Sequence, residues 1–338
     1  MRSPAEFWDH LARRLTRTLN KVNGMYSALT TNIAISPDVQ NALDNNRAVV
    51  ALESTIFSHL GLPSPANREA LDRCIAAITD AGATPAITAV INGVARVGIS
   101  DDEHHLILGP AKKVGERELA LAIAQRWPFG ATTVSASLLL ARRAGIGVFA
   151  TGGIGGVHRG ANIHGDISAD VSSDVSSDLG ALAAHQVVTV CAGAKSFLDL
   201  PRTLEYLETL SVPVIGLACD EFPAFTVHSS GLPIPARVED VHQLADVVRA
   251  HIALGRSGGI LACVPVPINE SLDRDLIDAV IETALAATAL AGIEGPAVTP
   301  HVLGAIAAAT GGASVRANLA LAENNARVAA ELAVALAK

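Results

Sequence analysis

The chain has 338 residues, of which 50% are hydrophobic, 17% charged and only 3% aromatic, so it is long enough to bury a large core in one or two domains. A formal net charge of −8 disfavours general binding to nucleic acid or to an anionic membrane, because such binding needs a basic excess that releases counterions. The scarcity of aromatic residues also disfavours a stacking platform for single-stranded nucleic acid.

Short β-branched runs bounded by glycine or proline alternate along the chain with longer segments of helical spacing. The runs predicted as strands are 47–52, 85–91, 147–151, 187–192, 212–217 and 259–265. The segments predicted as helices are 66–82, 116–126, 135–144, 198–210, 239–255, 269–291 and 314–337. This alternation predicts an α/β fold, with a largely parallel sheet between two layers of helices.

The two ends of the chain differ in character. The first 34 residues contain arginines and acidic residues but no apolar core, so no secretory signal is predicted there. The most apolar segment, 278–293, contains two carboxylates and is predicted to be a buried helix rather than a membrane span. The C-terminal region after about residue 268 is predicted to be helical. Four widely spaced cysteines fit neither a disulfide framework nor a zinc ribbon, which favours a reducing, cytoplasmic compartment.

In an open parallel sheet, ligands bind beyond the carboxyl ends of the strands, so polar residues that follow the apolar runs are candidate site residues. Glu53 follows VVAL, and partial burial there suits a carboxyl group to proton transfer; a helix-capping acid is an equal alternative. Lys195 follows VVTVCAGA. An amine held away from water is a candidate nucleophile that forms Schiff bases with sugar aldehydes, and the alternative is a lysine whose charged group reaches the solvent.

Two further segments could bind a phosphate group. Residues 151–160, TGGIGGVHRG, place glycines directly after an apolar strand, where backbone N–H groups approach an anion closely. The segment lacks the spacing of a dinucleotide fingerprint and the Gly-Lys-Ser/Thr ending of a Walker loop, but His158 and Arg159 lie beside the glycines. Lys113 precedes a predicted helix and could hold a phosphate near its N-terminus, although a solvated surface lysine is the commoner case.

The segment DISAD, residues 166–170, opens a polar stretch that extends to residue 178. In an extended chain, Asp166, Ser168 and Asp170 would lie on one side. Two carboxylates and a hydroxyl are hard oxygen ligands that suit Mg²⁺ or Mn²⁺ better than zinc. The alternative interpretation is an Asp-rich turn without a ligand.

Several of these segments occur together, in the order and spacing seen in pseudouridine-5′-phosphate glycosidases. The motifs that carry the resemblance are ALEST (51–55), GATTVSAS (130–137), FATGGIGGVHRGA (149–161), DISAD (166–170), VCAGAKS (190–196), LEYLETLSVPVIG (204–216) and TGGASVRANLALAENNA (310–326). From about residue 35 to the end, the chain resembles this family. The resemblance implies a single catalytic domain over 35–338, an α/β/α sandwich and a homotrimer, with residues 1–34 as an extension outside it.

The resemblance also implies an activity, the reversible cleavage of the bond between ribose 5-phosphate and carbon 5 of uracil. It implies Lys195 as the covalent nucleophile, Glu53 as the proton donor and Asp166 as the ligand of a divalent metal, Mn²⁺ or another cation such as Mg²⁺. The residues that it implies as substrate contacts or pocket neighbours are Lys113, Val134, His158, Ser168, Ala169, Asp170 and Asn324. The expected partner is a small molecule, with no nucleic acid and no membrane.

The chain departs from the family pattern at three places near the expected site. The stretch DVSSDVSSD, residues 170–178, lengthens the polar segment just after the metal motif. The segment 58–65, SHLGLPSP, carries one extra residue, Leu60. A basic segment expected after Lys113 is replaced by Gly115-Glu116-Arg117, which affects the expected phosphate contacts. Two alternatives therefore stay open: a related sugar-phosphate lyase or glycosidase that uses another base, and a non-catalytic nucleotide-phosphate sensor on the same fold. Mere binding would need neither Lys195 nor Glu53, which disfavours the sensor.

Overall fold

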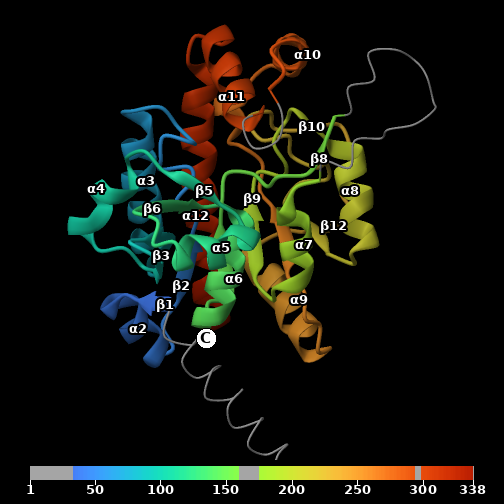
Figure 1. Ribbon diagram of the computed structural model, residues 1–338. Helices are drawn as coiled ribbons and strands as arrows, with labels where there is room; N and C mark the ends of the chain where they lie inside the picture. The colour runs from blue at the N-terminus through green and yellow to red at the C-terminus, as the bar shows by residue number, and fades with distance from the viewer. Residues whose placement is uncertain (1–32, 160–174, 294–297, 338) are drawn as a thin grey trace, which may run out of the picture.

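The structure is a computed structural model that describes residues 33–159, 175–293 and 298–337. Within these residues the centre of the molecule is an eleven-stranded sheet in the order β1-β4-β3-β2-β7-β9-β13-β11-β12, with β6 beside β3 and β5 beside β6 (Figure 1). The strands of this sheet are β1 (Ile33–Ile35), β2 (Val49–Leu52), β3 (Thr84–Ile91), β4 (Val94–Val97), β5 (Lys112–Val114), β6 (Phe129–Thr132), β7 (Val148–Ala150), β9 (Val188–Cys191), β11 (Val214–Leu217), β12 (Ala236–Val238) and β13 (Ile260–Cys263). The short strands β8 (Val157–His158) and β10 (Leu198–Asp199) pair separately.

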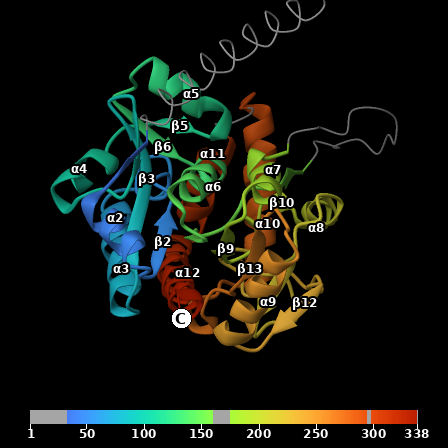
Figure 2. The ribbon, with the colours of Figure 1, turned by 90° about the horizontal axis from the view of Figure 1, so that it is seen from below.

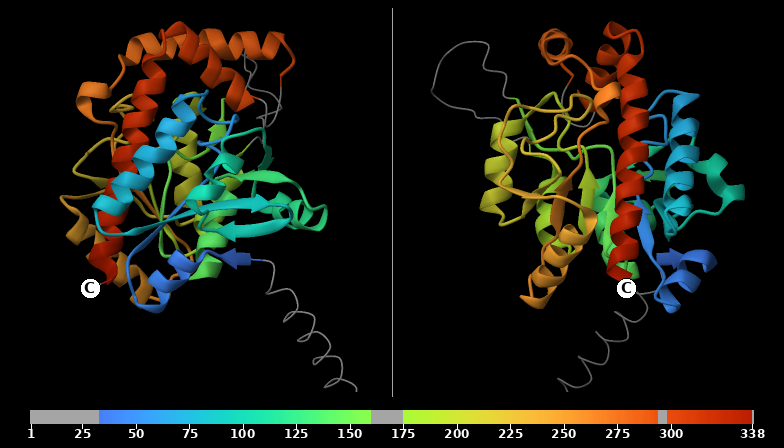
Figure 3. Two further views of the ribbon diagram at one scale, coloured as in Figure 1. Left: turned by 90° about the vertical axis from the view of Figure 1, so that its left-hand side faces the viewer. Right: turned by 180° about the vertical axis from the view of Figure 1, so that it is seen from behind.

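Helices connect most of these strands. They are α2 (Pro37–Asp44), α3 (Ala66–Asp80), α4 (His104–Ile107), α5 (Glu116–Ala124), α6 (Val134–Ala144), α7 (Ser177–Ala184), α8 (Leu200–Thr209), α9 (Val241–Ala253), α10 (Arg274–Leu290), α11 (Val298–Ala309) and α12 (Ala313–Ala337). Figures 1 and 3 show α10 and α11 lying across one end of the sheet, where they cover the ends of the central strands.

The predicted parallel arrangement is confirmed for the main part of the sheet. Strands β3, β2, β7, β9, β13, β11 and β12 all pair in parallel with their neighbours. The exceptions are β4 and β6, which run antiparallel to β3. These two strands were not predicted, because VARV contains a charged residue and FGAT has a single β-branched residue, so neither has the continuous apolar run of the buried parallel strands.

Alternate residues of each central strand belong to different cores. Val50 and Leu52 point into a core shared with α3, α9 and α12, whereas Val49 and Ala51 point into a second core shared with α5, α6 and α7. This follows from the two-residue period of a strand. The predicted three-layer arrangement is therefore confirmed, as the view along the sheet in Figure 2 shows.

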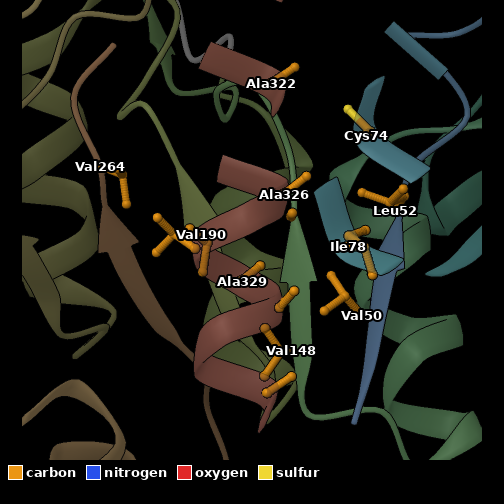
Figure 4. Packing of buried hydrophobic residues seen from close by; sticks show 14 of the residues in the cluster. Val50, Leu52, Cys74, Ile78, Val148, Val190, Val264, Ala322, Ala326 and Ala329 are labelled. Carbon is orange, nitrogen blue, oxygen red and sulfur yellow. The ribbon is translucent and has the colours of Figure 1, made fainter. Parts of the chain in front are cut away.

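Helix α12 packs directly on the middle of the sheet. Ala322, Ala326 and Ala329 of its buried face belong to the same core as Val190 and Val148 of the sheet, and Figure 4 shows Ala322 on the side of Cys74. Alanine side chains are short, so this helix can approach the strands closely. The alanine content of the C-terminal sequence thus serves helix-on-sheet packing.

Ile78, on α3, is fully buried where α3 meets this core. Replacing Ile78 by alanine is expected to lower the free energy of unfolding by about 2–5 kcal/mol, because the change removes buried methyl groups and leaves a cavity. Urea denaturation with matched slopes measures the loss. The control is Ile252→Ala on α9, where the side chain is 51% exposed and little change is expected; equal losses in the two variants would contradict this packing.

Three helices lie outside the predicted helical segments: α2, α4 and α7. Helix α7 begins inside the Asp- and Ser-rich polar stretch that ends at residue 178, and its first residues are N-terminal capping types. In the described residues no single helix is both long and apolar enough to cross a bilayer. Helices α11 and α12 meet that test of length and composition only as a pair, across a bend of 117°.

Candidate active site

A cavity of about 500 Å³ opens at the carboxyl ends of β2, β7 and β9. This is where the topology of an open parallel sheet predicts a ligand. The cavity brings together Glu53, Lys113, Val134, His158 and Lys195, all of which were predicted from the sequence as site residues. Thr299 and Leu303 of α11 form part of the opposite wall.

The loop that carries Glu53 is held by a network of buried hydroxyl groups. Strand β6 runs against β3, so its carboxyl end arrives beside the carboxyl end of β2. There the Thr55 backbone N–H donates to the Thr132 carbonyl (3.2 Å), and the Thr132 N–H donates to Ser54 Oγ (3.0 Å). Thr132 Oγ1 in turn donates to the Thr88 carbonyl at 2.7 Å. The ALEST motif is therefore fixed by the antiparallel strand that the sequence analysis missed.

Glu53 is a buried carboxyl group at the bottom of the cavity, with 8% of its surface exposed. Thr151 Oγ1 donates a hydrogen bond to Glu53 Oε1 at 2.5 Å. Burial raises the pKa of Glu53 above its ordinary value, against the opposing effects of the Lys195 charge and the Thr151 hydrogen bond. A raised pKa favours the protonated form, which suits the Glu53 carboxyl group to proton donation.

Lys195 lies on the tight turn that follows β9. Gly193 has a φ of +70°, and a Cβ there would lie only 2.0 Å from the Pro223 carbonyl oxygen, so the turn requires glycine. The Lys195 side chain is half-buried, and its Nζ donates to the Gly153 carbonyl at 3.0 Å. The turn thus directs the amine from β9 into the cavity, toward the glycine loop that follows β7.

Lys113 and His158 line the same cavity from other elements. Lys113 lies on β5 and is exposed at the rim, yet partial desolvation and the Lys195 charge lower the pKa of its amine. The half-buried His158 ring lies on β8, with its centroid 6.4 Å from that of Phe197. The amines of Lys113 and Lys195 therefore line the same cavity, where they are available to bind an anionic group of a substrate.

Asp178, which the sequence analysis did not select, fixes the glycine loop. It is 5% exposed and lines the cavity near the start of α7. Its two oxygens accept hydrogen bonds from the backbone N–H groups of Ser135 (3.1 Å) and Gly155 (2.9 Å). The carboxylate therefore links the N-terminus of α6 to the loop between β7 and β8.

Replacing Asp178 by alanine is expected to lower the free energy of unfolding by about 2–3 kcal/mol, because two buried N–H groups lose a charged acceptor. Urea denaturation measures the effect. Asp246→Ala is the control, since its side chain is 77% exposed and its loss is expected to cost little. A D178A protein as stable as wild type would show that Asp178 does not tie the two elements together.

Four of the predicted site residues, Asp166, Ser168, Ala169 and Asp170, lie outside the described residues. They belong to a four-residue repeat: the pattern Asp-X-Ser-(Ala/Ser)-Asp occurs at 166–170, 170–174 and 174–178. Val175, Ser176, Ser177 and Asp178, from the last repeat, line the cavity. The first repeat resembles the family motif most closely, while the last is the one that the structure places at the cavity.

The predicted asparagine, Asn324, is not among the residues that line the cavity. It is partly exposed on α12 and accepts a hydrogen bond from Arg327 at 2.8 Å. Two other asparagines of α12 face inward: Asn318 lines the cavity with 9% of its surface exposed, and Asn325 is fully buried. Their places follow from helical periodicity, because positions 318 and 325 are two turns apart on one face.

Within the described ranges no group of three or more His, Cys, Asp or Glu side chains could hold a metal ion. The three carboxylates that line the cavity already accept hydrogen bonds, Glu53 from Thr151, Asp178 from two backbone N–H groups and Glu118 from the Gly115 N–H. These residues alone do not provide the set of free oxygen ligands that Mg²⁺ or Mn²⁺ requires, so no catalytic step is assigned to a metal.

Comparison with known proteins shows the family to which the chain belongs. The profile of the indigoidine synthase A like proteins matches residues 38–335. The chain belongs to this family. Within it, the pseudouridine-5′-phosphate glycosidase of Herpetosiphon aurantiacus is 47% identical over 308 residues, which cover 90% of this chain and 98% of the relative. The enzyme of the same name from Myxococcus xanthus is 46% identical, over 91% of this chain and 99% of its own.

Solved structures of the family share the fold. The prealnumycin C-glycosynthase AlnA, in complex with ribulose 5-phosphate, superposes with a TM-score of 0.81 at 34% identity, covering 91% of this chain and 97% of its own. An indigoidine synthase A-like protein of Thermotoga maritima superposes with a TM-score of 0.80 at 32% identity, covering 91% of this chain and 98% of its own. The resemblance inferred from the motifs is thus confirmed, and so is the α/β fold.

Proposed function

We propose that this chain is a pseudouridine-5′-phosphate glycosidase, which cleaves its substrate reversibly with water to uracil and ribose 5-phosphate. The observation that carries the proposal is the meeting of the buried Glu53, whose pKa is raised by burial, with the amine of Lys195 in one cavity. Relatives of this name align along nine-tenths of the chain.

The bond to be broken joins two carbons, which explains why both groups are needed. Direct expulsion of a carbanion from the ribose is prohibitive, so a covalent route divides the step into smaller ones. The Lys195 amine attacks the anomeric carbon and displaces the ring oxygen, to which Glu53 delivers its proton; the Glu53 carboxylate then takes up the proton that the lysine nitrogen loses. The lysine nitrogen forms a C=N bond while the bond to uracil breaks, and Glu53 passes that proton to uracil carbon 5. Water hydrolyses the imine, releasing ribose 5-phosphate and the free lysine.

The phosphate and the sugar would be held by groups around these two residues. The Lys113 amine supplies a positive charge, and Val134, at the start of α6, and His158 line the same cavity. Fixing the substrate in this way holds the anomeric carbon in the correct orientation for attack.

Homotrimer assembly is also part of the proposal and rests on the resemblance. Light scattering on the purified protein tests it.

We also propose a divalent cation, Mn²⁺ or Mg²⁺, with Asp166 as a ligand; this rests on the resemblance alone. Removing metal with EDTA is expected to abolish uracil release, and added Mn²⁺ is expected to restore it. Asp166→Asn should weaken this activation, with Asp174→Asn as the matched variant because Asp174 occupies the same place in the last repeat. Full activity after metal removal would contradict the cation requirement, and loss of activation in D174N alone would contradict the role of Asp166.

One alternative keeps the same residues but changes the base. It is favoured by the similarity to AlnA, which is described as a C-glycosynthase. Incubation with pseudouridine 5′-phosphate and Mn²⁺, followed by chromatography of uracil and ribose 5-phosphate, decides between the two. Release of both products supports the proposal. Failure to release uracil, with a C-glycoside formed from ribose 5-phosphate and another aromatic carbon acceptor, supports the alternative.

A further inference from the structure

The C-terminal helix reaches the proton donor through a short chain of buried hydrogen bonds. Asn325, in the middle of α12, donates from Nδ2 to the carbonyl oxygens of Thr151 (2.8 Å) and Gly152 (3.3 Å). Thr151 in turn donates from Oγ1 to Glu53 Oε1 at 2.5 Å. The three side chains come from α12, the end of β7 and the end of β2.

Asn325 carries an unsatisfied group in the core. It is 0% exposed, and its Oδ1 has no hydrogen-bond partner among the described residues. Rotating the amide by half a turn would face that oxygen toward two carbonyl oxygens, so the two acceptors fix the orientation. An orphaned buried acceptor costs stability, and a leucine of similar size would avoid that cost. The position of Asn325 is thus explained better by the backbone it holds than by packing.

The backbone of Thr151 is held on both sides. Its N–H donates to the Val190 carbonyl of β9 at 3.1 Å, while its carbonyl accepts from Asn325. With the main chain fixed, the Thr151 hydroxyl is directed at Oε1 of Glu53. Because that oxygen accepts a hydrogen bond, the proton of a protonated Glu53 is confined to the other oxygen, Oε2.

We propose that Thr151 and Asn325 are positioning residues that fix the Glu53 carboxyl group and direct its proton to Oε2. This inference rests on the proposed function, in which Glu53 donates a proton. The charged groups that face Glu53 are Lys195, Lys113 and Asp178, and they come from the β9 turn, β5 and α7. None of them occupies the position of the Thr151 hydroxyl.

The test compares the pH profile and the kinetic constants of uracil release in Thr151→Val with those of wild type. Valine keeps the shape of threonine but cannot donate, so kcat is expected to fall about 10–100-fold, while KM stays within about twofold. The hydrogen bond favours the charged carboxylate, so its loss raises the pKa of Glu53, and the alkaline limb of the kcat profile should move to higher pH. Thr151→Ser keeps the hydroxyl group, so its kcat and its alkaline limb should be close to those of wild type.

The matched control is Thr189→Val. Thr189 is a fully buried threonine on the neighbouring strand β9, its Oγ1 has no partner among the described residues, and it does not line the cavity. This variant should keep the wild-type kcat and the wild-type alkaline limb of the pH profile.

Asn325→Leu provides a second test that leaves Thr151 in place. Its kcat is expected to be lower than that of wild type, and its alkaline limb should move to higher pH by less than in T151V. Circular dichroism confirms that each variant is folded.

Three results would overturn the inference. The first is a folded T151V or N325L protein that keeps the wild-type kcat and alkaline limb. The second is a fall in kcat without any shift of the limb, and the third is an equal shift of the limb in T189V, because a merely structural change gives either of these two results. Failure of wild type to release uracil would instead reject the proposed function, so the two failures are distinguishable.

Discussion

Replacing Lys195 by alanine is expected to reduce kcat for uracil release by on the order of 10⁴-fold or more, as removal of a covalent nucleophile does in other enzymes. The expectation rests on the position of the amine, which the β9 turn directs into the cavity. Steady-state assays of purified K195A measure the loss, and circular dichroism checks that the fold is intact.

Lys195→Arg separates the two roles that the lysine could have. Arginine keeps the positive charge but cannot form an imine with the sugar, so K195R should be as inactive as K195A. Substantial activity in K195R would show that Lys195 acts only as a charge, and would contradict covalent catalysis.

Replacing Glu53 by glutamine is expected to lower kcat by about 10²–10⁴-fold, because glutamine can accept the Thr151 hydrogen bond but cannot donate an acidic proton. Wild-type activity should require protonated Glu53. Burial raises the pKa of this group, so activity should persist above the ordinary glutamate range and fall as the pH rises through the raised value.

The pH dependence of kcat in wild type and E53Q measures both effects. The alkaline limb due to Glu53 should be absent from the residual activity of E53Q. Glu282→Gln, at an exposed position on α10, is the control and should keep the wild-type profile. An unchanged limb in E53Q would assign that titration to another group and contradict the role of Glu53 as the acid.

The sequence predicted the buried parallel strands and the long helices well, because each is marked by a continuous apolar run or by helical spacing. Strands β4 and β6 were not predicted because neither has a continuous β-branched run: β4, VARV, contains an arginine, and β6, FGAT, contains a glycine and a single β-branched residue. Their pairing with β3 depends on contacts between distant segments. The buried Thr132 network that positions Glu53 was therefore not visible in the motif alone.

The candidate site was predicted in part. Glu53 and Lys195 were found because each follows an apolar strand, and the topology then brings them to one cavity. Asp178 was missed because a four-residue repeat offers several equivalent aspartates, and pattern alone does not say which one meets the cavity. Asn325 was missed for another reason: a single residue of helical phase separates it from Asn324, and only packing of α12 on the sheet decides which one faces inward.

The central claim, a covalent bond between Lys195 and the sugar, can be tested by reductive trapping. The protein is incubated with ribose 5-phosphate, Mn²⁺ and borohydride, and the intact mass and the modified peptide are determined by mass spectrometry. One pentose phosphate attached to Lys195, and absent from K195A, is the expected result. No adduct at saturating sugar, or an adduct on Lys113 in place of Lys195, would contradict the mechanism.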